Sequence, residues 1–309
     1  MCGRLHAMSK SKLHQKTRLG FLPLVLSFCV CVCTCSKQTR DPSPIIFPKI
    51  KIPSGSLGSF RVETSETHIL LFGFFDPKGG NTIPLLFDTG SDSSFLAEEI
   101  YPTPKILTWQ DRSLSFSVRK GILPEGVQGI LGHDFFQHTC IWWQGDTLTV
   151  FEASSAVCSS PEAYFSTELK LLVTEKKDSF YYVRNLRKGK TFWSLVDTGS
   201  SLSFLPSEYE AEAESQGNRR VFLAGGQIRD VALFYTKGPL DFETRQGITI
   251  SYFDFSFFRG ISLEHLQLSR EKDSEAVWVI GLNLLCRNPL FWDFERNHIG
   301  MYSRTQNIN

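Results

Sequence analysis

Residues 85 to 96 read LLFDTGSDSSFL, and residues 194 to 205 read SLVDTGSSLSFL. Both stretches carry an apolar run, then Asp-Thr-Gly-Ser, and both end in Ser-Phe-Leu. One Asp-Thr-Gly-Ser is weak evidence for any function, because Asp, Gly and Ser are ordinary turn residues. Two copies with the same surroundings indicate that the chain contains a duplicated unit.

The sequence around the two motifs also repeats in the same order. Before each motif, two apolar runs flank a turn, at residues 76 to 80 and 187 to 190, and this pattern predicts a β-hairpin. After each motif comes a hydrophobic-hydrophobic-Gly element, GILGHDFF at 129 to 136 and VIGLNLL at 279 to 285, with a tryptophan eleven residues past its glycine. Strand patterns dominate, and one short helix is predicted after Pro206 in SEYEAEAESQ. We expect a mainly β fold with two lobes produced by internal duplication.

Composition narrows the function classes. The chain has 309 residues with 41% hydrophobic residues, enough for a substantial core, and 33 basic against 32 acidic residues give a net charge of +1. This balance provides no bulk field for nucleic acid or another polyanion. His133, His138 and Cys140 lie close together in sequence, but they lack the partners of a tetrahedral metal site at normal spacing. We therefore expect no metal and no other cofactor.

The N-terminal segment has the order of an export signal. A basic stretch without acidic residues is followed by an apolar run from 19 to 35, which is short for a membrane span. Cys35, at its end, resembles the lipidated cysteine of a bacterial lipoprotein signal; the alternative is an uncleaved signal anchor. Residues 36 to 59 are rich in Pro and Ser and predict an extended tether. Both alternatives place the protein outside the cytoplasm and held at a membrane, in the cell envelope.

The paired motifs predict a specific chemistry. A strand that ends in Asp-Thr-Gly-Ser holds a carboxylate on a tight turn, where glycine lets the backbone fold sharply. If the turns meet at a pseudo-twofold axis, Asp88 and Asp197 come within a few ångströms and share one proton. One carboxyl group then acts as a general base toward a water molecule, and the other acts as a general acid.

At these residues the sequence resembles the aspartic proteases. VDTGSSLSFLPSEYEA looks like the second-lobe motif of the pepsin-like enzymes, whereas GILGHDFF and VIGLNLL are more similar to the single-lobed retroviral type. The resemblance covers about residues 60 to 303. It implies two pseudo-symmetric, β-barrel-like lobes of acid-protease type, with the N-terminal lobe at 60 to 155 and the C-terminal lobe at 165 to 303. It also implies that Asp88 and Asp197 are the catalytic dyad.

The resemblance assigns roles to the residues that follow each aspartate. Thr89 and Thr198 would exchange hydrogen bonds between the two loops and hold them rigid. The glycines would permit the loop geometry, and the serines would bond the outer carboxylate oxygens; these residues are Gly90, Gly199, Ser91 and Ser200.

The two halves differ in length between the motifs. From Asp88 to Gly132 is 44 residues, whereas from Asp197 to Gly281 is 84. The family covers its substrate with a hairpin called the flap, and the shorter interval offers only ILTWQDRSLSFSV for it. Trp109 is the aromatic residue that we expect to lie over a substrate. In the second half, RVFLAGGQIRDVALFY is either a second flap or a sheet hairpin.

Two classes of function remain open from the sequence. The first is a membrane-tethered aspartic endopeptidase that acts on peptides or proteins as a monomer with both lobes in one chain. The second is a catalytically inactive relative that binds peptides or only keeps the fold. Among the body cysteines Cys140, Cys158 and Cys286, one pair could bridge in an oxidising compartment. Cys140 and Cys158 are nearest in sequence, and the sequence does not fix the pairing.

Overall fold

The computed structural model describes residues 54–64, 68–120, 123–165, 168–177, 179–223, 227–260 and 278–302. The predicted export signal, Cys35 and the greater part of the tether lie outside the described residues. The first strand begins at Ser56, four residues before the expected start of the folded region at Phe60. The tether therefore gives way to sheet structure before residue 59.

No helix within these described ranges has the length and apolar character needed to cross a bilayer.

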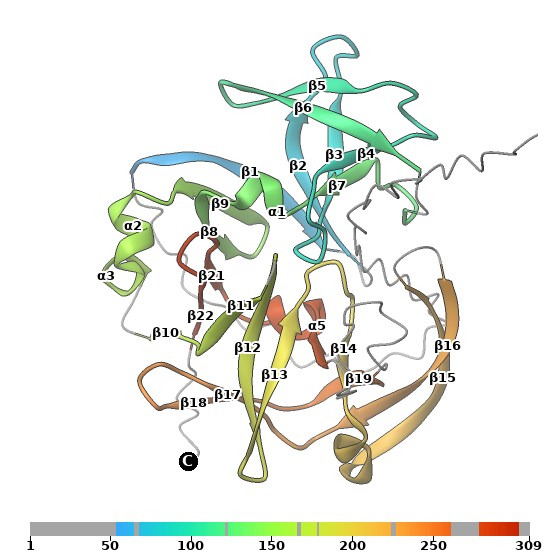
Figure 1. The fold of residues 1–309 in the computed structure, drawn as a ribbon, viewed down its shortest axis with the longest axis vertical. Coiled ribbons are helices and arrows are strands. Elements are labelled where there is room, and N and C mark those ends of the chain that lie inside the picture. The colour runs from blue at the N-terminus through green and yellow to red at the C-terminus, as the bar shows by residue number, and fades with distance from the viewer. Residues whose placement is uncertain are drawn as a thin grey trace, which may run out of the picture.

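The N-terminal half is built almost entirely from strands (Figure 1). Short helical turns follow β7 and β9. In chain order the elements are β1 (Ser56–Thr64), β2 (Ile69–Phe75), β3 (Thr82–Phe87), β4 (Phe95–Ala97), β5 (Lys105–Trp109), β6 (Arg112–Arg119), β7 (Gly129–Leu131), α1 (His133–Phe136), β8 (Thr139–Gln144), β9 (Thr147–Glu152), α2 (Ala156–Ser159) and α3 (Pro161–Phe165).

The C-terminal half repeats this plan with longer strands. Its elements are β10 (Leu169–Leu171), β11 (Thr174–Lys177), β12 (Phe180–Arg187), β13 (Lys190–Val196), β14 (Ser203–Leu205), η1 (Ser207–Glu212), β15 (Ala213–Leu223), β16 (Gln227–Thr236), β17 (Leu240–Glu243), β18 (Thr249–Tyr252), β19 (Phe255–Arg259), β20 (Trp278–Ile280), α5 (Leu282–Leu285), β21 (Leu290–Asp293) and β22 (His298–Tyr302).

The strand pairing shows that the two halves are copies. In the N-terminal half, β3 pairs parallel with β7, and β4 pairs parallel with β6 and antiparallel with β7. In the C-terminal half, β13 pairs parallel with β20, and β14 pairs parallel with β19 and antiparallel with β20. The same unusual mixture of directions occurs twice around the two Asp-Thr-Gly-Ser loops. The fold is mainly β with two pseudo-symmetric lobes, as the duplication predicts.

A shared sheet joins the lobes. Within the described residues, the larger sheet runs in the order β10-β22-β21-β8-β9-β1 before it continues into the N-terminal lobe. Figure 1 shows β8, β9, β21 and β22 between the upper group β2 to β7 and the lower group β12 to β19. Trp142 pairs with Phe291, and each lies ten residues past the glycine of its own half. Equivalent positions therefore face each other at the pseudo-twofold axis.

The hairpins predicted before each motif are confirmed. β2 and β3 flank the turn at 76 to 80, and β12 and β13 pair with Arg187 opposite Lys190. Lys188 and Gly189 make this second turn with φ of 47° and 77°, the left-handed conformation that two-residue hairpin turns require.

The helix predicted after Pro206 is shorter than expected. It is one 3₁₀ segment, η1, that ends at Glu212, and the following residues form β15 instead. This stretch has no apolar stripe at helical spacing, so pairing with β16 decides its conformation. The glycine-turn segment at 220 to 235 is a sheet hairpin, because β16 is paired on its other side with β19. The tip at 224 to 226 lies outside the described residues.

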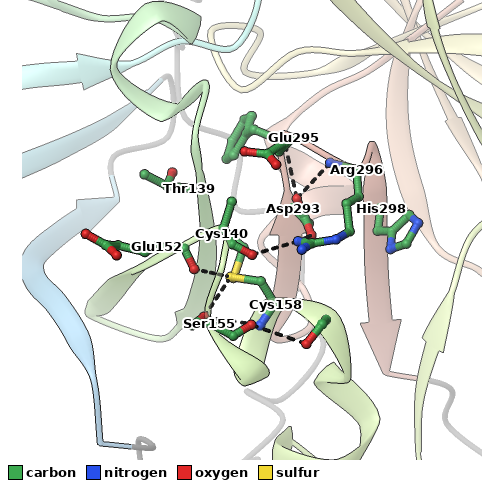
Figure 2. A network of polar contacts seen from close by, with 12 residues as sticks. Thr139, Cys140, Glu152, Ser155, Cys158, Asp293, Glu295, Arg296 and His298 are labelled. Atoms are coloured by element: carbon green, nitrogen blue, oxygen red, sulfur yellow. Dashed lines mark hydrogen bonds and ion pairs between the residues drawn. A yellow bond between two sulfur atoms is a disulfide. The ribbon is translucent and has the colours of Figure 1, made fainter.

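A disulfide and an ion pair with a fully buried carboxylate lie at the shared sheet (Figure 2). Cys140 on β8 is bonded to Cys158 on α2, with a Cα–Cα distance of 5.8 Å, so the pair nearest in sequence is the one that forms. Asp293 is fully buried, and its Oδ2 accepts from Arg296 at 2.8 Å. Arg296 also donates to the carbonyl of Ala153 at 2.8 Å, which ties the C-terminal strands to the end of β9.

Candidate active site

The two aspartates occupy equivalent turns. Asp88 follows β3, Asp197 follows β13, and both side chains are fully buried. The backbone N–H of Gly90 donates to Asp88 Oδ1 at 2.9 Å, and that of Gly199 donates to Asp197 Oδ1 at 2.8 Å. In each turn the backbone thus fixes one oxygen of the carboxyl group.

The two carboxyl groups face each other across the lobes. A Cβ atom built on Gly90 would lie 2.8 Å from Asp197 Oδ1, and one built on Gly199 would lie 2.6 Å from Asp88 Cγ. Each carboxyl group is therefore packed against the glycine of the other loop. Any side chain in place of either glycine would occupy the space of the opposite carboxyl group, which explains why both positions are glycine.

Two threonines cross-link the loops. The N–H of Thr89 donates to Thr198 Oγ1 at 3.0 Å, and the N–H of Thr198 donates to Thr89 Oγ1 at 3.1 Å. Each hydroxyl then donates to the strand of the opposite lobe, that of Thr89 to the Val196 carbonyl at 3.3 Å and that of Thr198 to the Phe87 carbonyl at 2.9 Å. All four bonds are buried, so they hold the two aspartates in register.

The serines do not bond where we expected. The hydroxyl of Ser91 donates to the Ser93 carbonyl at 3.0 Å, and that of Ser200 donates to the Leu202 carbonyl at 2.8 Å. A hydroxyl has a single proton, so neither serine donates to the outer carboxylate oxygen of its aspartate. The expected role of these serines is wrong in this structure; they close the turn locally.

Ionising both carboxyl groups at once is energetically unfavourable, because both are buried and their negative charges repel each other. Burial raises the pKa of Asp197 well above its ordinary value, and the negative charge of Asp88 raises this pKa further. Asp197 Oδ2 is buried and makes no hydrogen bond to a donor in the described part of the chain. A proton shared between the two carboxyl groups would satisfy that oxygen, and such a pair titrates as a unit.

A second, symmetric brace stands behind the loops, and the sequence reading missed it. Asp134 Oδ1 accepts from the N–H and hydroxyl of Ser94 at 2.8 and 2.6 Å. In the other lobe, Asn283 Oδ1 accepts from the N–H and hydroxyl of Ser203, both at 2.9 Å. The repeat in the sequence contains this brace: each serine lies six residues after the aspartate of its Asp-Thr-Gly-Ser motif. Each acceptor lies two residues after the glycine of the later hydrophobic-hydrophobic-Gly element.

The residues of the rejected metal cluster have other partners. His133 Nε2 lies 2.6 Å from the hydroxyl of Tyr181, His138 Nδ1 lies 3.4 Å from Glu295 Oε2, and Cys140 is in the disulfide. Within the described ranges, no group of three or more His, Cys, Asp or Glu side chains is placed to hold a metal ion.

Trp109 is not a flap residue. It ends β5, is 1% exposed, and its ring stacks on Phe60 with centroids 4.7 Å apart. Side chains alternate along β5, so that Leu107 and Trp109 point into the lobe while Ile106 points to solvent with 61% exposure. The expectation that Trp109 covers a substrate is therefore wrong, because its ring fills the core of the N-terminal lobe.

The fold of this chain is similar to that of a solved protein structure. The chain is similar to the crystal structure of an aspartic proteinase from Irpex lacteus, with a TM-score of 0.49 and 14% sequence identity. The matched region covers 81% of this chain and 98% of that chain. No family model and no curated protein sequence matches this chain. At this identity and score we draw nothing about activity from the similarity.

Proposed function

We propose that this chain is an aspartic endopeptidase in which Asp88 and Asp197 activate a water molecule against a peptide bond. One observation carries the proposal: each carboxyl group lies against the glycine of the opposite loop, within 3 Å of a Cβ built there. Two buried carboxyl groups so placed, at the junction of two lobes, form an acid and base pair when they share one proton.

The proposed reaction needs one ionised and one protonated carboxyl group. The ionised group takes a proton from water as the water attacks the carbonyl carbon, while the protonated group donates to the carbonyl oxygen. The tetrahedral intermediate then collapses as a proton passes to the departing amide nitrogen and the C–N bond breaks. The nucleophile is water throughout, so no bond forms between the enzyme and the substrate.

The surrounding loops contribute rigidity to this chemistry. The N–H groups of Gly90 and Gly199 fix the inner oxygens, and the threonine cross-link fixes the two loops relative to each other. Preorganised groups need little rearrangement as charge develops in the transition state. The high pKa of Asp197 supplies a carboxylic acid that stays protonated where an ordinary aspartate would ionise.

The decisive experiment removes one carboxyl group at a time. Asp88→Asn and Asp197→Asn should each abolish cleavage of an unfolded protein substrate at acid pH, with the fold retained by circular dichroism. Asp76→Asn is the matched control: Asp76 is also a buried aspartate of a turn, with 6% exposure, but it lies before β3 and pairs with Lys105. Cleavage that survives Asp88→Asn, or that a metal chelator blocks and pepstatin does not, would refute the mechanism.

One observation favours a second candidate, a non-catalytic peptide-binding protein. The described residues between Asp88 and Gly132 hold β4, β5, β6 and β7, and the aromatic residue expected to cover a substrate is buried in the core. The two candidates separate in one measurement. An active enzyme should both bind pepstatin and cleave protein, whereas the binding protein should bind peptide-like ligands without turnover at any pH.

We also propose that the protein is exported and anchored at the membrane by its N-terminus. The support is the basic-then-apolar order of residues 1 to 35 and the cysteine that ends it. Cell fractionation should place the wild type with membranes, and Cys35→Ala should release an exported soluble form or leave the signal uncleaved. Recovery of the wild type as a free cytosolic protein would exclude this localisation.

A further inference from the structure

One buried cluster joins the two lobes through His133, and the equivalent position of the second copy holds Leu282. His133, the first residue of α1 in the N-terminal half, is 8% exposed. Its Nε2 atom lies 2.6 Å from the hydroxyl of Tyr181 on β12 and 3.3 Å from Nζ of Lys176 on β11. Both partners belong to the C-terminal lobe, so this single nitrogen contacts two neighbouring strands of the opposite half.

The equivalent position in the second copy shows that the fold does not require a polar side chain here. Leu282 begins α5 as His133 begins α1, and the N–H of each donates to the serine carbonyl of its own catalytic loop, Ser200 or Ser91, at 2.8 Å in both cases. The backbone role is thus shared, and only the imidazole is particular to the first copy. Its side chain must be explained by what it contacts.

The charges around the imidazole oppose each other. Burial lowers the pKa of His133, and the Lys176 ammonium lowers it further, whereas Asp92 and Asp134 raise it. Lys176 also lies over the ring of Tyr181 at 5.0 Å. Burial and the charge of Asp293 raise the pKa of Tyr181, so its phenol stays protonated over the whole working range.

The hydroxyl of Tyr181 fixes the direction of the hydrogen bonds. It donates its single proton to the Phe294 carbonyl at 2.9 Å, beyond the end of β21. Nε2 of His133 can therefore bond to this hydroxyl only by donating a proton to it. If Nε2 instead carries its lone pair, it accepts a hydrogen bond from Lys176. The hydroxyl of Tyr181 can then bond to Nε2 only by donating its proton there and no longer to the Phe294 carbonyl.

We propose that His133 is a proton-controlled link between the lobes. As the neutral imidazole with its proton on Nδ1, it accepts a hydrogen bond from Lys176 at Nε2; on protonation of Nε2 it repels Lys176 and donates to Tyr181, whose hydroxyl donates to the Phe294 carbonyl. Protonation of His133 therefore removes its hydrogen bond to Lys176 on β11. In its place, a chain of hydrogen bonds runs from His133 on α1 through Tyr181 on β12 to the Phe294 carbonyl next to the shared sheet. The backbone N–H of His133 also donates to the carbonyl of Ser91, so the same residue contacts the loop that carries Asp88.

The first test measures the histidine directly, by its NMR titration, with His133→Gln used to assign the signal. Lys176→Met should raise the pKa of His133 by about one unit, a tenfold gain in proton affinity, because a repelling charge is removed. Tyr181→Phe should lower it, because the protonated ring loses its acceptor. Lys177→Met, which removes the same charge one residue further along β11, should leave it unchanged.

The second test follows the attachment of β11 by amide hydrogen exchange. As the pH falls through the titration of His133, the β11 amides should lose protection in the wild type relative to His133→Gln; the intrinsic pH dependence of exchange is common to both proteins and cancels. In Lys176→Met, the β11 amides should lack this protection already at neutral pH. This variant provides an independent test if His133→Gln folds poorly.

Two results would overturn the proposal: a His133 pKa that Lys176→Met does not raise, or β11 protection that changes with pH equally in the wild type and in His133→Gln. Neither readout uses peptide cleavage. The link can therefore be refuted while the proposed peptidase stands, and it can hold in a protein that cleaves nothing.

Discussion

The threonine cross-link makes a quantitative prediction about stability. Thr198→Val keeps the shape of the side chain and removes its hydroxyl, which accepts from the N–H of Thr89 and donates to the carbonyl of Phe87. Both partners belong to the other lobe, and Thr198 is fully buried. The substitution therefore leaves one donor and one acceptor without partners in a site that solvent does not reach.

The magnitude follows from these two orphaned groups. A buried polar group left unsatisfied costs about 1–3 kcal/mol, so Thr198→Val should lower the free energy of unfolding by about 3 kcal/mol or somewhat more. Thr89→Val orphans a different pair, the N–H of Thr198 and the carbonyl of Val196. Because the two hydroxyls lie 3.4 Å apart in one hydrogen-bond network, the effects of the two single variants should not add in the double variant.

Urea unfolding with linear extrapolation measures the effect. Thr149→Val is the matched control: Thr149 is equally buried, but within the described residues its hydroxyl bonds to that of the half-buried Ser59, at 3.1 Å, and to no backbone group. It should cost less than about 1 kcal/mol. If Thr198→Val unfolds within 1 kcal/mol of the wild type, or no lower than Thr149→Val, the cross-link does not hold the lobes as we describe.

Three further predictions concern the dyad and its support. The raised pKa of Asp197 means that its contribution to stability is present at low pH and is lost as pH rises above the unfolded value of 3.8; Asp197→Asn should therefore raise the unfolding free energy at pH 7, and this gain should vanish below about pH 3.8 in urea titrations. Gly199→Ala, whose Cβ would lie 2.6 Å from Asp88 Cγ, should abolish cleavage in the peptide assay, and full activity would contradict the packing of the two loops. Removing the Cys140–Cys158 disulfide by double substitution with Ala should cost about 3 kcal/mol, given the 18-residue separation; an unchanged melting temperature would show that the bond adds nothing.

The sequence alone determined the duplication and most of its local structure. Apolar runs that end in Asp-Thr-Gly-Ser specify a strand and a tight turn through short-range effects, so both hairpins and both loops could be read directly from the residues. Periodicity and turn chemistry act within a few residues, and they were sufficient for these elements.

Only the tertiary structure decided which side of a strand faces the core and which groups meet across the lobes. The sequence predicted that Trp109 lies over a substrate, yet the alternation of side chains along β5 and the stacking on Phe60 place its ring in the core of the N-terminal lobe. The serines after each aspartate could bond a carboxylate or a nearby carbonyl, and the turn geometry selected the carbonyl. His133 lies 43 and 48 residues before Lys176 and Tyr181, and no local pattern relates it to them. Their meeting depends on how two folded lobes dock, which is a property of packing rather than of any short stretch of the chain.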